Sequence, residues 1–264
     1  MSTLTTCLML ALALTAQSIG QPPGPEQWEP LPELTDEFDG DELDVTKWHD
    51  HNPGWKGRQP AFFAPENVTV SDGSMHVAAK REDREGLPEG YHTFTTGAVQ
   101  STVLVKYGYF EVRCKAGHSR ASAAFWFYEN TPHMWTEIDV FEIGAGAPDH
   151  AKKMHMNVHV FHTPVEKKHW AKAGVHEHAE NLSEDYHAYG LKWTPKAIVF
   201  YFDGEEVGRR ENTHWHQALT MNFDCETMPT WFGLPDEANL PAAFSTDYVR
   251  AWRLAGATEV RTRE

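Results

Sequence analysis

Short stretches rich in β-branched and aromatic residues follow one another along most of the chain. Turn-forming pairs such as Asp72-Gly73 and Asp203-Gly204 separate them, a pattern typical of antiparallel strands joined by hairpins. Almost no segment has the apolar repeat of an amphipathic helix. The pattern therefore predicts an all-β chain folded as a sandwich of two antiparallel sheets. The expected strands are Asn67–Val70, Met75–Ala79, Thr96–Val105, Tyr109–Lys115, Ala123–Tyr128, Glu137–Phe141, Met154–Phe161, Ala188–Thr194, Ile198–Phe202, Leu219–Asp224 and Ser245–Leu254.

The chain begins with an apolar run from Leu8 to Ala16, which small residues at Ser18 and Gly20 follow. Such a run is typical of a signal peptide, and it is shorter than the roughly twenty apolar residues of a membrane-spanning helix. We expect residues 1–20 to direct secretion, extracellular or periplasmic, with cleavage after Ala16 or Gly20. After cleavage we expect no contact with a membrane.

About 240 residues remain after the signal, enough for a single large β domain. We expect a Pro-rich leader at 21–32, one domain over 33–256 and a C-terminal tail at 257–264. The polar stretch Glu166–Asp185 is predicted to be a long insertion that is partly helical.

The net charge of -15, with only 23 Lys and Arg, disfavours a nucleic-acid partner, because binding nucleic acid depends on neutralising phosphates. Ten Trp and eight Tyr are many for this length. Their flat faces can pack against sugar rings, although most large aromatic residues lie in the core. We expect a polysaccharide partner and a monomeric protein.

Two cysteines, Cys114 and Cys225, follow the presumed signal, which itself contains Cys7. They allow one disulfide after export. Cys114 lies inside an alternating strand, where a buried thiol is the commoner outcome.

The segment 135–142 is an acidic strand and the candidate for the catalytic residues. Strand alternation places Trp135, Glu137 and Asp139 on one face and Thr136, Ile138 and Val140 on the other, which faces the core. Glu142 has the wrong parity, unless an extra residue around Val140-Phe141 forms a β-bulge. The alternative is a solvated acidic face, which the interleaved apolar residues disfavour.

With the bulge, the two glutamate Cα atoms would lie about 13 Å apart. Side chains that lean inward on a concave sheet could then bring the carboxyls to about 5 Å, the spacing of retaining glycosidases. Crowded carboxylates repel one another, so at least one should keep its proton near neutral pH, as a general acid must.

The run Glu137-Ile138-Asp139-Val140-Phe141-Glu142 resembles the E-x-D-x-x-E motif of glycoside hydrolase family 16 in its bulged form. Segments at 107–113, 124–127, 189–195, 203–204 and 247–250 resemble family segments in the same order. The resemblance implies a β-jelly-roll with a concave cleft. It also implies that Glu137 is the nucleophile, Glu142 the acid/base and Asp139 an auxiliary acid hydrogen-bonded to the nucleophile, with no cofactor needed for chemistry.

Neighbouring strands supply further candidates for the cleft by the same parity. Each set could equally be an exposed surface pair. Two histidines on one strand could also bind a metal ion, but such a site needs a third ligand, and the nearby acids already have a predicted catalytic role. The candidates are His155, Asn157 and His159; Glu111 and Arg113; Trp126 and Tyr128; and Asn222, Asp224 and Glu226.

The turn-rich loop at 52–63 offers an aromatic platform, Trp55, and a cation, Arg58. Its Trp-x-Gly-Arg-x-Pro core, together with Thr136, is similar to the agarase and porphyranase branches of the family and unlike the laminarinase pattern. We therefore expect endo-cleavage of agarose or porphyran, with κ-carrageenan a weaker choice. A sulfated sugar would need a cation or a polar nest in its pocket, and Arg58, Arg113 and Arg120 are the candidate cations.

Two other functions use the same fold. A non-catalytic carbohydrate-binding protein would be expected to lose Glu137 or Glu142, and both are present. A transglycosylase would use the same residues but keep water away from the glycosyl-enzyme.

The family resemblance also implies a structural calcium ion, held by Asp247 with backbone oxygens near Phe38 and Gly73. Asp247 could instead pair with Arg250 or cap a turn.

Overall fold

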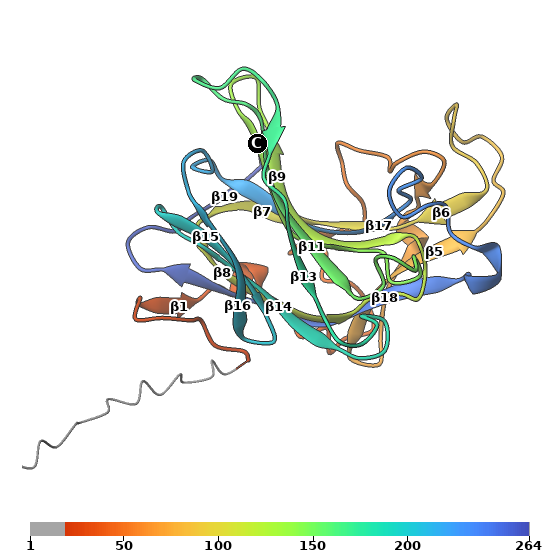
Figure 1. Cartoon of the computed structure of the whole chain (residues 1–264), viewed down its shortest axis with the longest axis horizontal. Helices are drawn as coiled ribbons and strands as arrows, with labels where there is room; N and C mark the ends of the chain where they lie inside the picture. Colours follow the sequence, from red (N-terminus) through yellow and green to blue (C-terminus); the bar gives the residue numbers. More distant parts are fainter. Residues whose placement is uncertain (1–18, 264) are drawn as a thin grey trace, which may run out of the picture.

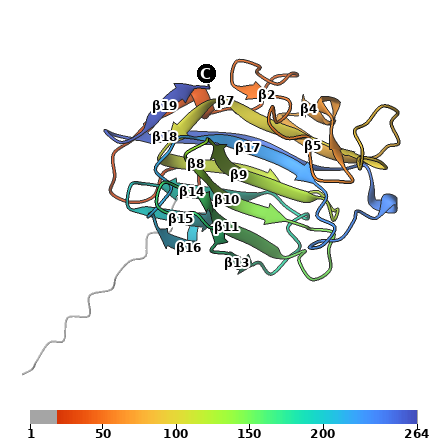
Figure 2. The same ribbon diagram turned by 90° about the horizontal axis from the view of Figure 1, so that it is seen from above.

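A computed structural model describes residues 19–263 and shows two β-sheets packed face to face (Figures 1 and 2). Residues 1–18, which hold the apolar run of the predicted signal peptide, lie outside the described residues. Among the described residues there is no α-helix, only strands and three short 3-10 turns at Pro32–Leu34, Pro65–Asn67 and Glu237–Asn239. The predicted all-β sandwich is confirmed.

One sheet, called the back sheet here, has β8 and β18 at its centre. Its pairings are antiparallel except for the short parallel pair β3 and β6. Its order is β16 (Glu205–Glu211), β15 (Ala197–Phe202), β14 (His187–Trp193), β8 (Gly108–Lys115), β18 (Ala242–Leu254), β5 (Ser74–Arg81), β6 (Phe94–Thr96) and β3 (Phe62–Phe63), with β1 (Trp28–Pro30) on β18 and β4 (Val68–Ser71) on β5.

The other sheet, the front sheet, is antiparallel throughout and contains the acidic strand β10. Its order is β12 (Trp170–Ala171), β11 (Lys153–His162), β10 (Trp135–Ile143), β9 (Ser122–Asn130), β17 (Leu219–Glu226), β7 (Ala98–Lys106) and β19 (Glu259–Thr262), with β13 (Gly174–Glu177) on β11 and β2 (Trp48–His49) on β7.

The core lies between the sheets and is built from alternate residues of each strand. Phe110 and Val112 of β8 face Phe125 and Phe127 of β9, and all four are fully buried. Burying such side chains contributes roughly 1.5–3 kcal/mol each. The same alternation leaves every second residue of β9, β10 and β11 on the outer face of the front sheet.

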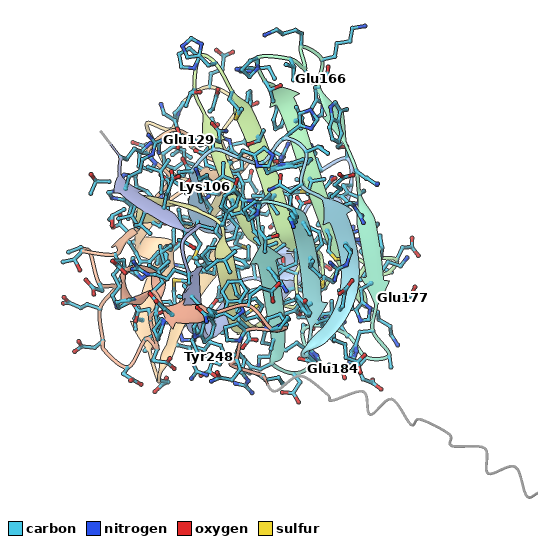
Figure 3. The ribbon with its side chains drawn as sticks, turned by 90° about the vertical axis from the view of Figure 1, so that its left-hand side faces the viewer. Lys106, Glu129, Glu166, Glu177, Glu184 and Tyr248 are labelled. Carbon is cyan, nitrogen blue, oxygen red and sulfur yellow. The ribbon has the colours of Figure 1, made fainter. Side chains whose placement is uncertain are left out.

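The predicted strands are all present, with ends shifted by a few residues. The stretch 166–185 is not helical and forms β12 and β13, which pair with β11. Glu166, Glu177 and Glu184 mark this stretch along one side of the molecule (Figure 3). The leader contributes β1, and the segment expected to be a tail contains β19. These short strands cover sheet edges whose backbone groups would otherwise lack partners.

The two cysteines lie in different sheets, Cys114 on β8 and Cys225 on β17, and both are buried free thiols. Burial raises the pKa of both thiols, so they stay protonated. The alternative of a disulfide is therefore not realised in this structure. No helix long and apolar enough to cross a bilayer occurs in residues 19–263.

Candidate active site

Strand β10 carries an extra residue between Asp139 and Glu142. Against β9, Asp139 pairs with Trp126 and Phe141 pairs with Phe125, so Val140 has no counterpart. Val140 and Phe141 are both completely buried in the core. The predicted bulge is thus confirmed, and it returns Glu142 to the face that carries Glu137.

The outer face of the front sheet is hollowed into a cleft of about 440 Å³. Strands β9, β10 and β17 form its floor, and the loop at 52–63 forms one side. The sequence-predicted residues that line it are Trp55, Arg58, Trp126, Tyr128, Trp135, Glu137, Asp139, Glu142, Asp224 and Glu226.

Aromatic rings flank the carboxylates on both sides. Trp126 stacks on Tyr128 at a ring distance of 4.7 Å, and Trp55 meets Trp126 edge-on at 6.2 Å. On the opposite side Trp135 stacks on Phe161 at 4.0 Å. Each ring is held by a neighbour, so the cleft offers fixed flat faces of the kind that pack against sugars.

The three carboxyl groups of β10 are shielded from solvent. Burial raises the pKa of Glu137 and of Glu142 well above the ordinary glutamate value, and nearby carboxylates raise both further. Burial also raises the pKa of Asp139, although His159 opposes that rise. At least one of these groups therefore holds its proton near neutral pH.

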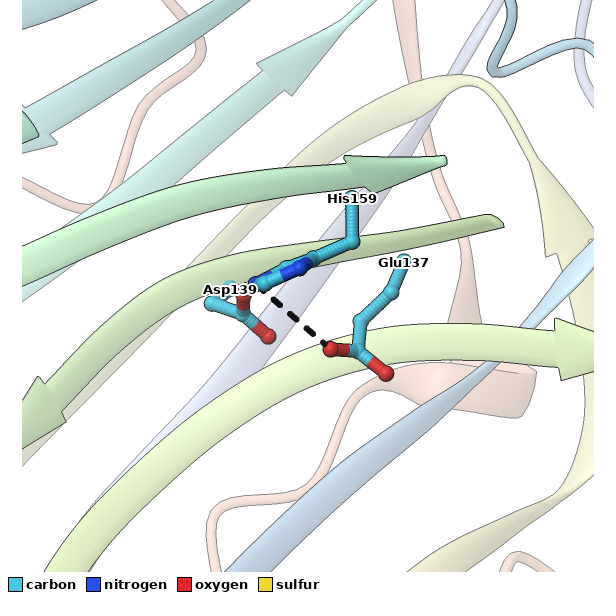
Figure 4. A group of neighbouring side chains, drawn as sticks. All are labelled: Glu137, Asp139 and His159. Atoms are coloured by element: carbon cyan, nitrogen blue, oxygen red, sulfur yellow. Dashed lines mark ion pairs between the residues drawn. The ribbon is translucent and has the colours of Figure 1, made fainter. Parts of the chain in front are cut away.

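His159 of β11 reaches across to this group (Figure 4). Its Nε2 lies 3.2 Å from Asp139 Oδ2 and 3.9 Å from Glu137 Oε1. One ligand atom from each of the three residues lies within 4.8 Å of the others, close enough to hold a cation. Asp139 and Glu137 already have a role in the acidic motif, so we assign His159 to positioning them.

A second acidic pair lies on β17. Asp224 is 2% exposed and accepts a hydrogen bond of 2.5 Å from Trp126 Nε1. Glu226 accepts two from Arg58, at 2.8 and 3.3 Å. Burial raises the pKa of Asp224 well above its ordinary value and, against the pull of Arg58, raises that of Glu226 to about 7. Asp50, a carboxylate before this loop that could have paired with Arg58, contacts His51 Nδ1 at 2.7 Å instead.

Several lining residues were not predicted from the sequence. Phe161 lies on the same face of β11 as His159, and Asn130 on the same face of β9 as Tyr128, so alternation alone would have found both. Trp215, which is buried in the core beneath the cleft and does not line it, had no such signal. It comes from a loop, and its indole nitrogen donates 2.8 Å to the backbone oxygen of Glu137.

The prediction that Glu111 and Arg113 line the cleft is wrong. Both lie on β8 of the back sheet, on the face turned away from the core. Glu111 is 1% exposed and accepts hydrogen bonds from the hydroxyls of Tyr109 and Tyr248 and from the N–H of Gly20. Strand parity identifies the outward face of a strand but not the sheet to which it belongs.

Three further candidates face outward on the front sheet but do not line the cleft. Asn222 is buried and hydrogen-bonded to Gln100 and to Thr220. Asn157 uses its side-chain oxygen to accept the N–H of Val158. His155 lies across from Glu142 at the end of the cleft.

Asp247 is paired with Arg113, at 2.6 Å, and Arg250 pairs with Glu37 instead. Within the described residues, no group of three acidic or histidine ligands gathers around Asp247. Calcium there stays a prediction, tested by whether EDTA and added calcium move the melting temperature.

Comparison with known proteins places this geometry in context. The family model described as "Beta-porphyranase A-D, GH16 domain" matches residues 28–254. β-Porphyranase D of Zobellia galactanivorans is 30% identical over 91% of this chain, which spans 64% of that protein. β-Porphyranase E of the same organism is 29% identical, covering 86% of this chain and 88% of the relative.

Among solved structures, porphyranase B from Zobellia galactanivorans superimposes with a TM-score of 0.79, covering 90% of this chain and 98% of that one. At 23% identity this likeness shows the shared fold.

Proposed function

Because the chain belongs to glycoside hydrolase family 16, in its β-porphyranase A–D group, we propose that it hydrolyses β-linkages within a red-algal galactan, porphyran. The enzyme class is that of the family, a retaining glycoside hydrolase, and the fold is its β-jelly-roll. Porphyran is preferred to agarose because both curated relatives compared above are named β-porphyranases.

The mechanism rests on the bulge at Val140, because the bulge places the side chains of Glu137 and Glu142 in the same cleft. In the first step Glu142 gives its proton to the glycosidic oxygen while a carboxylate oxygen of Glu137 bonds to the anomeric carbon, and the leaving sugar departs as an alcohol. In the second step Glu142 takes a proton from water, whose oxygen displaces Glu137 and restores both carboxyls. The raised pKa of Glu142 suits this double role.

We assign Asp139 and His159 to positioning. Asp139 is 5% exposed, and His159 Nε2 lies 3.2 Å from its Oδ2 and 3.9 Å from Oε1 of Glu137. A proton on either group would let the pair hydrogen-bond without adding negative charge beside Glu137. Such an arrangement supports an ionised nucleophile next to a protonated acid.

Substrate binding is assigned to the aromatic faces and to Arg58. Trp55, Trp126 and Trp135 border the cleft on both sides of the carboxylates. The side chain of Arg58 is 52% exposed although two of its nitrogens bind Glu226, so its other N–H groups remain available to a hydroxyl or sulfate.

We further propose that the protein is secreted and acts as a monomer. The apolar run at Leu8–Ala16 supports export, and a polymer of this kind must be cut outside the cell before its fragments can enter. The chain's own carboxyl groups suffice for the reaction, so no cofactor is assigned.

The test is incubation of the protein with porphyran, agarose, κ-carrageenan and laminarin, followed by sizing of the products. We expect rapid shortening of porphyran to a ladder of oligosaccharides. Glu137→Gln should lose at least about a thousandfold in rate, because an amide cannot attack the anomeric carbon. Products longer than the starting polysaccharide chains would indicate a transglycosylase, and binding of porphyran with no cleavage would indicate a carbohydrate-binding protein.

A further inference from the structure

Three arginines were candidates for binding a sulfate, and the structure separates them. Arg58 is paired with Glu226, and Arg113 is paired with Asp247. Arg120 makes no ion pair or side-chain hydrogen bond with any residue in 19–263. A cation without an internal anion is the one that is free to bind an external anion.

Arg120 lies in the loop between β8 and β9 and is partly exposed. It packs against Gly233, where an added Cβ would come within 3.2 Å of its Nη1 and 3.5 Å of its Cδ. Gly233 has a φ of +84°, a conformation suited to glycine, so the close approach and the turn require the same residue. The guanidinium therefore lies beside the turn that ends at Gly233.

That turn presents a flat aromatic face. The N–H groups of Trp231, Phe232 and Gly233 all donate to the carbonyl of Met228, at 3.0, 3.0 and 3.1 Å, which makes a closed turn. Trp231 is 39% exposed and stacks on buried Phe232 at a ring distance of 4.3 Å. Within the described chain, Trp231 is the one aromatic among the exposed large hydrophobic side chains.

The turn adjoins the catalytic cleft. The ring of Trp231 lies 4.8 Å from that of His155, and His155 is the cross-strand partner of Glu142. His155 Nε2 lies 3.0 Å from His150 Nδ1. Burial lowers the pKa of His155 to about 4, so this link between acid/base and aromatic turn is uncharged near neutral pH.

We propose that Trp231, Arg120 and His155 form a further sugar-binding subsite beyond Glu142, which takes a galactan unit carrying a sulfate ester. Trp231 stacks on the sugar face, Arg120 pairs with the sulfate, and His155 hydrogen-bonds a hydroxyl between this unit and the scissile bond. The inference rests on the proposed function, because it assumes that a galactan occupies the cleft. It adds a second point at which sulfate is recognised, separate from Arg58.

The experiment measures binding of porphyran octasaccharide and agarose octasaccharide to the Glu137→Gln protein, in which turnover is blocked. Trp231→Ala should weaken both ligands about fivefold, through lost stacking. Arg120→Ala should weaken porphyran oligosaccharide about tenfold and agarose oligosaccharide less than about twofold. Leu234→Ala, on the same loop, and Arg253→Ala, on the back sheet, serve as controls that should change neither.

A melting temperature for each variant shows that it has folded. Equal losses on both ligands for Arg120→Ala, or no loss for either variant, would overturn the subsite while leaving turnover of porphyran by the wild-type protein intact. Failure of the wild-type protein to cleave either polymer, with no binding by Glu137→Gln, would instead overturn the proposed function and this inference with it.

Discussion

Arg58 lies over Glu226 in the cleft, with its Nε and Nη2 at 2.8 and 3.3 Å from the two carboxylate oxygens. The side chain of Glu226 is only 6% exposed, whereas that of Arg58 is 52% exposed. The guanidinium thus shields a buried carboxylate on one side and offers donors to the substrate on the other. Its removal should have two separable effects.

The first effect is on substrate choice. Arg58→Ala should lower kcat/KM on porphyran, because it removes a charge-assisted contact that stabilises the transition state by roughly 1.5–3 kcal/mol. The loss on agarose should be smaller. Trp55→Ala should lower kcat/KM on both polymers alike, because stacking does not depend on sulfate. If Arg58→Ala instead lowers both polymers equally, Arg58 acts only by holding Glu226 and the loop in place.

The second effect is on pH dependence. The positive charge of Arg58 lowers the pKa of Glu142, so its loss makes ionised Glu142 less favourable and raises that pKa. The protonated acid should then persist to higher pH, and the alkaline limb of kcat/KM should move to higher pH. Arg253→Ala, on the back sheet, should leave the limb in place. A shift in the opposite direction would contradict the role of Glu142.

Loss of the acid can be tested separately. Glu142→Ala should retain cleavage of substrates with activated leaving groups, which need little protonation, and azide should restore turnover by attacking the glycosyl-enzyme on Glu137. The diagnostic product is a β-glycosyl azide. If azide gives no rescue with an activated substrate, Glu142 is not the acid/base.

The buried carboxyl of Asp224 should cost the protein stability at alkaline pH. Its pKa is raised in the folded state, so its contribution to stability is present below the unfolded value of about 3.9 and is lost as pH rises toward the folded value. Asp224→Asn should therefore raise the melting temperature at pH 8 by about 2–4 °C for each kcal/mol recovered, and change it little at pH 4.

The matched control is Asp41→Asn, at an exposed position, which should show no such difference between the two pH values. A destabilised Asp224→Asn protein at pH 8 would mean that the carboxylate is ionised and held by charges in the cleft.

Local alternation predicted most of the strands and the face of β10 that carries Glu137 and Asp139, because both depend only on neighbouring residues. It even required the bulge before Glu142. It failed for Glu111, because the assignment of β8 to the back sheet depends on pairing with strands far away in the sequence. Trp215 and Trp231 were not predicted for a similar reason, since their loops reach β10 and β11 only after the sheets have formed.

Because Val140 has no partner on β9, the way β10 pairs with its neighbour matters as much for the catalytic site as the residues it contains. A strand with the same sequence but regular pairing throughout would keep all three acids in order, yet alternation would send the last carboxyl into the hydrocarbon interior. Such a protein would still own an aromatic groove suited to sugars and would have lost its proton donor. Deletion of one residue between Asp139 and Glu142 would have the opposite effect, because the last glutamate would then stand two residues after Asp139 and regular alternation alone would keep it in the cleft.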